Sequence, residues 1–255
     1  MMTPFEVVIP ARIGSTRLPR KVLRNLAGKP VLQWVWQAAK AAGARTVTIA
    51  TDSEEVATLC RRFGAVVAMT DPVHQSGTDR VNEVARQQGW PADTIIVNVQ
   101  GDEPLIPPAL IKQAAQLLAD DAEAHLATLA HPLHELADFI NPNGVKVVAD
   151  RRGYALSFSR APIPWQRDGS SREAPLLPHG LAHRHIGLYA YRAGALAEFS
   201  SLSPAALETC EALEQLRALT HGFRIKLGFT DQPPPRGVDT EDDIQALEAH
   251  LAASR

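Results

Sequence analysis

The stretch FEVVIPARIGSTRLPRK, residues 5–21, joins a short apolar run to a loop with four cationic side chains. Residues 5–9 are rich in Val and Ile and lead into a proline, which is typical of a buried β-strand. The loop then carries Arg12, Arg17, Arg20 and Lys21 in a chain whose formal net charge is -2. Arg offers a bidentate fork and Lys a point charge, so the loop suits a polyphosphate. Taken alone, the same charges also fit a solvated basic loop.

Three more apolar runs of the same kind follow, at 46–50, 65–69 and 94–99. Amphipathic patterns lie around them and predict helices over 30–43, 52–64, 77–89 and 107–121. Ser53 and Thr78 are the expected N-caps of the second and third of these helices. The regular alternation predicts an α/β fold with a mostly parallel sheet and helices on both faces. The cationic loop then lies at the carboxyl ends of the strands, where such sheets bind ligands.

The alternation weakens from about residue 125. Antiparallel strands are expected over 143–150, 154–165 and 185–192, with a polar, proline-rich loop at 166–180. The pattern returns with a helix over 204–221, a strand over 224–229 and a last helix from Thr240. We therefore expect one domain over residues 1–255, with a smaller mixed or antiparallel sub-domain inserted at approximately 125–200.

The composition argues against several classes of protein. The chain has 255 residues, of which 45% are hydrophobic and 21% charged, as in an ordinary globular domain. A near-neutral charge argues against nucleic-acid binding, which usually needs a basic face. Two cysteines are too few for a disulfide framework. We recognise neither a secretory signal nor an apolar run long enough to span a membrane, so we expect a cytoplasmic protein with no membrane partner.

Two carboxylates stand at positions that suit a metal ion. Asp102 directly follows the fourth predicted strand, and Asp239 precedes the last predicted helix. Taken singly, Asp102 fits a turn-former and Asp239 a helix cap. Mg²⁺ prefers one or two carboxylates together with phosphate oxygens and water, so beside a cationic loop they favour a nucleotide–Mg²⁺ site. The chain carries neither a Walker A motif nor G-x-G-x-x-G.

A resemblance to a known family rests on eight segments that occur in order across nearly the whole chain: IPARIGSTRLPRK (9–21), HQSGTDR (74–80), VNVQGDEP (97–104), NPNGVKVV (141–148), FSRAPIPW (158–165), RHIGLYAYR (184–192), LEQLR (213–217) and GVDTEDD (237–243). Together they resemble the 3-deoxy-manno-octulosonate (Kdo) cytidylyltransferases of the nucleotidyltransferase superfamily. The early segments also resemble CMP-sialic acid synthetases, while HQSGTDR and FSRAPIPW favour the Kdo branch. The resemblance implies a Rossmann-like nucleotidyltransferase sheet and a homodimer formed through the inserted sub-domain.

The resemblance also implies a reaction and a set of site residues. CTP and Kdo would give CMP-Kdo and pyrophosphate, with Mg²⁺, as a step in lipopolysaccharide synthesis. Arg12, Lys21 and Asp102 would be catalytic, with Arg12, Lys21 and Arg17 on the CTP phosphates. Asp102 and Asp239 would hold Mg²⁺. The cytidine pocket would be lined by Ser76, Gly77, Thr78 and Arg80. The sugar would be bound by Gln100, Arg160, His185, Tyr189, Glu211 and Gln215.

Several of these positions have plainer interpretations. Tyr189 also fits a core position of a strand, and the i, i+4 spacing of Glu211 and Gln215 also fits a solvated helix face. Arg20 stands where the family usually has a small residue, so it could crowd the loop or add a phosphate contact. The histidines within HGLAHRH (179–185) have a spacing that permits zinc, although the resemblance explains only His185.

Two other functions stay open at this point. One is a cytidylyltransferase for another acid sugar, such as sialic acid or 8-amino-Kdo. The other is a non-catalytic nucleotide-binding module, against which the pair of Asp102 and Asp239 argues, because a mere binder does not need two metal-binding carboxylates.

Overall fold

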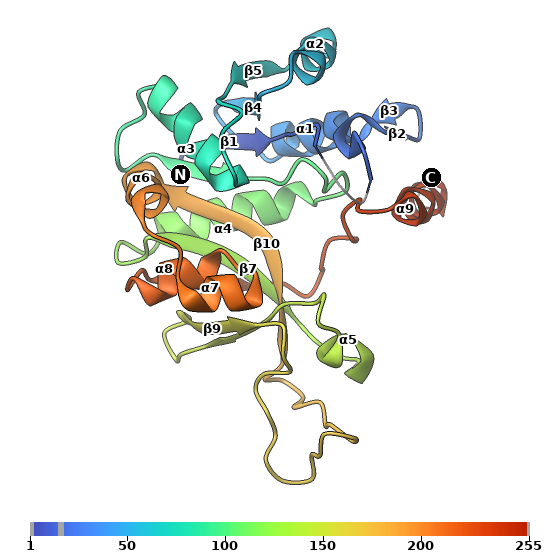
Figure 1. Ribbon diagram of the computed structural model, residues 1–255, viewed down its shortest axis with the longest axis vertical. Helices are drawn as coiled ribbons and strands as arrows, with labels where there is room; N and C mark the ends of the chain where they lie inside the picture. The colour runs from blue at the N-terminus through green and yellow to red at the C-terminus, as the bar shows by residue number, and fades with distance from the viewer. Residues whose placement is uncertain (1–2, 15–17, 254–255) are drawn as a thin grey trace.

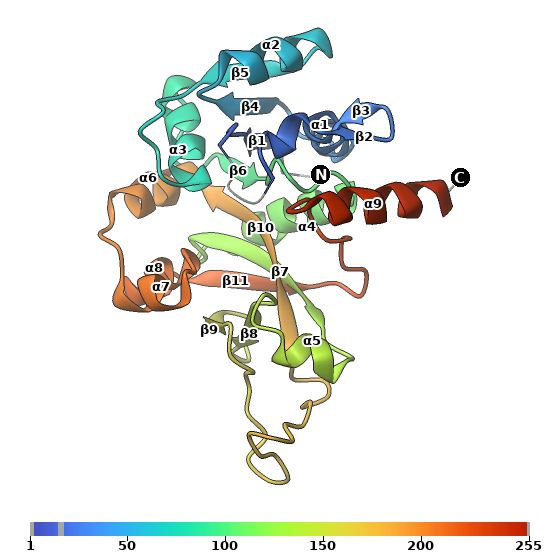
Figure 2. The same ribbon diagram turned by 45° about the vertical axis from the view of Figure 1, so that its right-hand side comes forward.

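The central sheet organises the whole molecule, which is given by a computed structural model that describes residues 3–14 and 18–253. Among these residues the sheet has nine strands in the order β11-β7-β10-β6-β1-β4-β5, with β8 paired to β10 and β9 paired to β8 (Figures 1 and 2). In chain order they are β1 (Phe5–Pro10), β4 (Val47–Thr51), β5 (Val66–Met69), β6 (Ile95–Asn98), β7 (Leu126–Pro132), β8 (Lys146–Ala149), β9 (Ala155–Ser159), β10 (His183–Arg192) and β11 (Ile225–Phe229).

The pairing of the strands confirms the predicted α/β class. β1 runs parallel to β4 and β6, β4 runs parallel to β5, and β11 runs parallel to β7. β10 is antiparallel to β6 and to β7, so it joins the two parallel parts into one mixed sheet. Because β1 and β6 are parallel neighbours, the loops that follow them leave the sheet at the same edge.

Helices cover both faces of the sheet. The longer ones are α1 (Val31–Ala41), α2 (Glu54–Arg62), α3 (Gly77–Gln87), α4 (Pro108–Ala119), α6 (Ala193–Ser201) and α9 (Glu241–Ala253). Alternation along β1 directs Val7 and Ile9 to a core with α1, α2 and α4, while Val8 packs with α3, α6 and α8 (Gln215–Thr220). The described residues include no helix that is long and apolar enough to span a membrane.

The segment predicted as an inserted sub-domain shares strands with the central sheet. β7 and β10 lie in the sheet itself, and only β8, β9, α5 (Leu136–Ile140) and the loop after β9 extend away from it (Figure 1). β10 holds these parts together, because its first residues also pair with β8. The boundaries of approximately 125–200 therefore enclose two central strands as well as the projecting part.

Two local predictions are wrong. Ser76, not Thr78, caps α3, and its Oγ accepts from the amide of Asp79 at 3.1 Å. The single helix predicted over 204–221 is two helices, α7 (Ala206–Glu211) and α8, because Ala212 adopts a left-handed conformation with φ 50° and ψ 51°. The predicted Ser53 cap of α2 is confirmed, since its side chain accepts from the amide of Val56.

The last helix returns to the start of the chain. α9 lies beside α1 and the small ribbon of β2 (Asn25–Leu26) and β3 (Lys29–Pro30), as Figures 1 and 2 show. Leu26, Val31 and Ile244 share a small core there. This packing brings Asp239, just before α9, close to the cationic loop after β1.

Candidate active site

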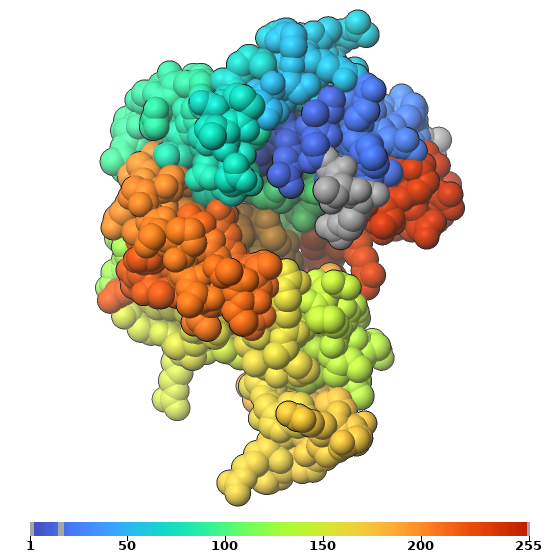
Figure 3. All heavy atoms as spheres, in the orientation of Figure 1, coloured from blue at the N-terminus to red at the C-terminus, as the bar shows by residue number. Residues whose placement is uncertain are grey.

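A cavity of about 610 Å³ opens at the carboxyl ends of β1 and β6. Its walls come from the loop after β1, the start of α3, the turn after β6 and the break between α7 and α8. Figure 3 shows this face hollowed between the α3 region and the α7–α8 region. The cavity therefore lies where ligands of parallel sheets bind, as the sequence predicted.

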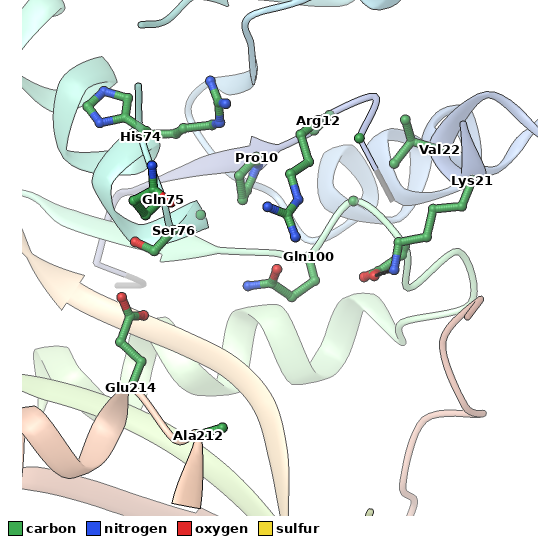
Figure 4. Close-up of a pocket in the computed structure, with 16 residues that line it drawn as sticks. Pro10, Arg12, Lys21, Val22, His74, Gln75, Ser76, Gln100, Ala212 and Glu214 are labelled. Carbon is green, nitrogen blue, oxygen red and sulfur yellow. Dashed lines mark hydrogen bonds and ion pairs between the residues drawn. The ribbon is translucent and has the colours of Figure 1, made fainter. Parts of the chain in front are cut away.

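The cationic loop contributes two side chains to this cavity. Arg12 points into the cavity above Gln100 (Figure 4). Lys21 and His74 lie at opposite ends of the cavity. Arg17 lies outside the described residues. Arg20 does not line the cavity: it has a left-handed backbone with φ 58°, and its guanidinium pairs with Glu55 on α2. The contact with α2 is neither of the two alternatives predicted for Arg20, which were crowding of the loop and an added phosphate contact.

Lys21 joins the two predicted metal ligands. Its Nζ donates to Oδ2 of Asp102 and, at 3.1 Å, to Oδ1 of Asp239. Burial opposes the charged ammonium, and the two carboxylates outweigh that effect, so the pKa of Lys21 is raised. The amide of Val238 donates to the carbonyl oxygen of Asp102 at 2.8 Å, which ties the segment before α9 to the turn after β6. A Cβ at Gly237 would lie 3.0 Å from that oxygen, so this close approach favours glycine.

The donor set around Lys21 fits Mg²⁺. The side chains of Asp102 and Asp239 are 29% and 41% exposed, so both can still reach water or a ligand. In the part of the chain that the structure describes, no three His, Cys, Asp or Glu side chains gather as a metal site. Two carboxylates suffice for Mg²⁺, because it usually keeps waters and binds substrate phosphates in the remaining positions. Among the described residues, the histidines at 179–185 are likewise not gathered into such a group.

The predicted cytidine pocket forms the wall at the start of α3. Ser76, Gly77 and Arg80 line the cavity. Arg80 is only 3% exposed, and its guanidinium donates to Asp52 at 2.6 Å and to Thr70 Oγ1 at 2.7 Å. Because its donors are bound to the ends of β4 and β5, Arg80 braces this wall. Thr78 is buried and does not line the cavity.

Glu214 is a cavity residue that the sequence reasoning missed. Its carboxylate points across the cavity toward Ser76, as Figure 4 shows, and accepts from Thr78 Oγ1 at 2.6 Å. Burial raises its pKa, and the hydrogen bonds from Thr78 and Ser76 lower it by less. The residue lies within the LEQLR segment, but the sequence offered no sign of the break at Ala212 that turns it toward α3. His74 is a further lining residue that was missed, while Gln75, which also lines the cavity, begins the QSGTDR segment (75–80) predicted to line the cytidine pocket.

The structure divides the predicted sugar-binding set. Gln100 lines the cavity described above. Arg160 and Glu211 contact each other instead: Glu211 accepts from the Arg160 amide at 2.9 Å, and the Arg160 guanidinium donates to the Glu211 carbonyl at 2.7 Å. Glu211 lines a second cavity of about 410 Å³ beside β9. Because Ala212 ends α7, Glu211 and Gln215 do not share a helix face.

The other predicted sugar contacts lie on or beside β10. His185 packs against the rings of Phe158 and Tyr189, and burial lowers its pKa to about 3. A neutral His185 has no positive charge with which to pair a carboxylate. The Tyr189 hydroxyl is buried without a hydrogen-bond partner among the described residues. Gln215 lies beside Tyr189 and Glu214 around a small void.

The fold and this site define the class of nucleotide-binding cytidylyltransferases. A family model described as cytidylyltransferase matches residues 7–225. A 3-deoxy-manno-octulosonate cytidylyltransferase of Pseudomonas fluorescens is 52% identical over 99% of this chain and 100% of its own length. One of Pseudomonas syringae pv. tomato has the same identity and coverage. The chain therefore belongs to the 3-deoxy-manno-octulosonate cytidylyltransferase family.

Solved structures agree with this assignment. A structure of CMP:2-keto-3-deoxy-manno-octonic acid synthetase complexed with CTP has a TM-score of 0.89 and is 38% identical, over 99% of this chain and 100% of that chain. A cytidylyltransferase from Leptospira borgpetersenii has a TM-score of 0.63 at 15% identity, over 99% of this chain and 88% of that chain. At that identity the second likeness concerns the fold alone.

Proposed function

We propose that this protein transfers CMP from CTP to the anomeric hydroxyl of Kdo and releases pyrophosphate. One observation carries the proposal: Lys21, Asp102 and Asp239 converge at the edge of a cavity that the cationic loop also enters. This is an arrangement for gripping a triphosphate and a divalent cation, in a chain whose 52% identical relatives are named for this reaction. Membership of the family makes a non-catalytic module the weaker alternative.

The chemistry is an in-line displacement at the α-phosphorus. The Kdo hydroxyl oxygen forms the new bond, the bond from the α-phosphorus to the bridging oxygen breaks, pyrophosphate leaves and the hydroxyl proton is released. The protein contributes positions and charges rather than a covalent intermediate. Arg12 and Lys21 bind the phosphates and stabilise the charge that develops on the α-phosphate and on the departing pyrophosphate.

Asp102 and Asp239 would hold Mg²⁺, whose charge would offset that of the triphosphate and make the sugar hydroxyl more nucleophilic. Ser76 and Gly77 form the cytidine wall, with Arg80 as its brace. Gln100 reaches the sugar from the floor of the cavity. Arg160, His185, Tyr189, Glu211 and Gln215 stay predicted sugar contacts, and Arg160 is the one with a positive charge for the Kdo carboxylate.

The assembly and the compartment are parts of the same proposal. Large apolar side chains are exposed on β9 and on the loop that follows it, namely Leu156 (62% exposed), Trp165 (46%) and Leu181 (63%). The proposal is that these side chains pack against a second copy of the chain, in a symmetric homodimer. Cys60 and Cys210 are free thiols, which suits a reducing compartment, and we propose the cytoplasm.

A direct assay tests the function. The purified protein, CTP, Mg²⁺ and one acid sugar at a time are incubated, and pyrophosphate and the CMP-sugar are measured. Kdo should be the preferred sugar over 8-amino-Kdo and sialic acid. Equal or better use of another sugar would transfer the assignment to that sugar. CTP binding without product for every sugar would support a binding module instead.

A further inference from the structure

Lys21 occupies the position that the proposed function requires for a metal ion. Its ammonium donates to Oδ2 of Asp102 and to Oδ1 of Asp239, and its side chain is only 18% exposed. Two carboxylates that approach this closely repel each other unless a cation lies between them. Lys21 supplies that cation in the structure described here.

These contacts leave Lys21 with two incompatible roles. Mg²⁺ binds oxygen at about 2.0–2.1 Å, so an ion held by both aspartates would lie between the two carboxylates, where the ammonium of Lys21 now lies. An ammonium and a divalent ion on the same two oxygens would also repel each other strongly. Lys21 therefore has to leave Asp102 and Asp239 before both can hold a metal, and it then needs another anionic partner.

Ion pairs with α2 and α9 flank Lys21 on both sides in the chain. Arg20 pairs with Glu55 on α2, and Arg24 pairs with Glu241 in the first turn of α9. Between them Val22 is buried, so the segment of η1 (Lys21–Leu23) is held in place. The flexible four-carbon stem of lysine is the part that can move, and it can turn its ammonium from the aspartates to a phosphate in the same cavity.

We propose that Lys21 is a positioning residue that keeps Asp102 and Asp239 together in the nucleotide-free protein and exchanges them for the triphosphate when nucleotide and metal enter. This inference rests on the proposed function. Its consequence is an order of events: a metal ion alone binds weakly, because it competes with Lys21, while phosphate oxygens give Lys21 a new partner and release both carboxylates. The exchange thus couples metal binding to nucleotide binding.

The test measures Mn²⁺ binding without nucleotide, by the loss of the free Mn²⁺ signal in electron paramagnetic resonance. Lys21→Met and Lys21→Gln remove the competing charge and should each tighten Mn²⁺ binding by about tenfold, the order of effect of one close charge. Lys21→Arg keeps the charge and should bind Mn²⁺ as weakly as the wild type. Lys29→Met is the matched control, because Lys29 contacts Gln37 and Trp34, and it should leave Mn²⁺ affinity unchanged.

Asp102→Asn, alone and combined with Lys21→Met, shows how much of the measured Mn²⁺ binding depends on Asp102. If Lys21→Met binds Mn²⁺ no better than the wild type, while Asp102→Asn still weakens binding, the exchange is wrong and the metal site stands. If no protein binds Mn²⁺ in an Asp102-dependent way, the exchange fails together with the proposed metal site. Product formation from CTP and Kdo is assayed separately, so a failure of the proposed function is seen independently. Thermal melting checks that each variant is folded. Lys21→Met and Lys21→Gln are both made so that the test can still be carried out if one of them does not fold.

Discussion

Replacing Arg80 by Met should destabilise the protein and loosen the predicted cytidine wall. The guanidinium joins α3 to Asp52 after β4 and to Thr70 after β5, and the side chains of Arg80 and Asp52 are 4% and 19% exposed. Breaking a buried ion pair by removing one partner costs roughly 3–5 kcal/mol. Water can still reach part of Asp52, so we expect the free energy of unfolding to fall by about 3 kcal/mol, the lower end of this range.

The assay is urea denaturation of the wild type, Arg80→Met, Asp52→Asn and the double variant. Because the two side chains contact each other, the double variant should be less destabilised than the sum of the single variants, by about 1–2 kcal/mol. CTP affinity, measured by calorimetry, should fall in Arg80→Met, because Ser76 and Gly77 lie on the wall that Arg80 braces. Losses that simply add, or a variant as stable as the wild type, would refute the bracing role of Arg80.

Four further outcomes are expected. Asp102→Asn should lower turnover by at least about a hundredfold in a protein that still folds; normal turnover with Mg²⁺ would remove this residue from the metal site. Lys21→Ala should lower both kcat and CTP affinity, and a change confined to the KM for Kdo would contradict its phosphate role. CTP should be strongly preferred over UTP and ATP in the pyrophosphate assay, and equal use would remove the cytidine-pocket assignment. Burial lowers the pKa of His185 from 6.5 to about 3. Between pH 6.5 and pH 3 the unfolded chain therefore binds a proton at His185 that the folded chain does not bind, and the stability of the wild type should fall as the pH falls through this range. The urea midpoint of His185→Asn should fall less over the same range.

Local sequence patterns were enough to predict most of the strands and helices and the edge of the sheet at which the site lies. Apolar runs bounded by turn residues predicted β1, β4, β5 and β6, because a buried strand needs only a few consecutive apolar side chains. Capping chemistry located α2 through Ser53. At α3 the same reasoning predicted Thr78 instead of Ser76, because both residue types are good N-caps. In the folded protein the Thr78 hydroxyl donates to Glu214, a contact that the sequence alone could not indicate.

The break between α7 and α8 could not be predicted in the same way. Ala212 has a high helix propensity, yet it adopts a left-handed conformation. Glu211 on one side of it accepts from Ser159 and Arg160, and Glu214 on the other side accepts from Thr78. These partners belong to distant parts of the chain, so packing overrides the local preference.

The sequence by itself determined the alternating α/β architecture, the cationic loop after the first strand and the two aspartates that suit a metal. Each of these features, and each aspartate taken singly, was identified from its immediate neighbours in the chain. Only the tertiary structure decided that Lys21 lies between Asp102 and Asp239. That contact depends on α9 packing beside α1 and on the bond from the Val238 amide to the Asp102 carbonyl. The physical reason is that contacts between distant segments are selected by the packing of the whole chain, which no local pattern of residues encodes.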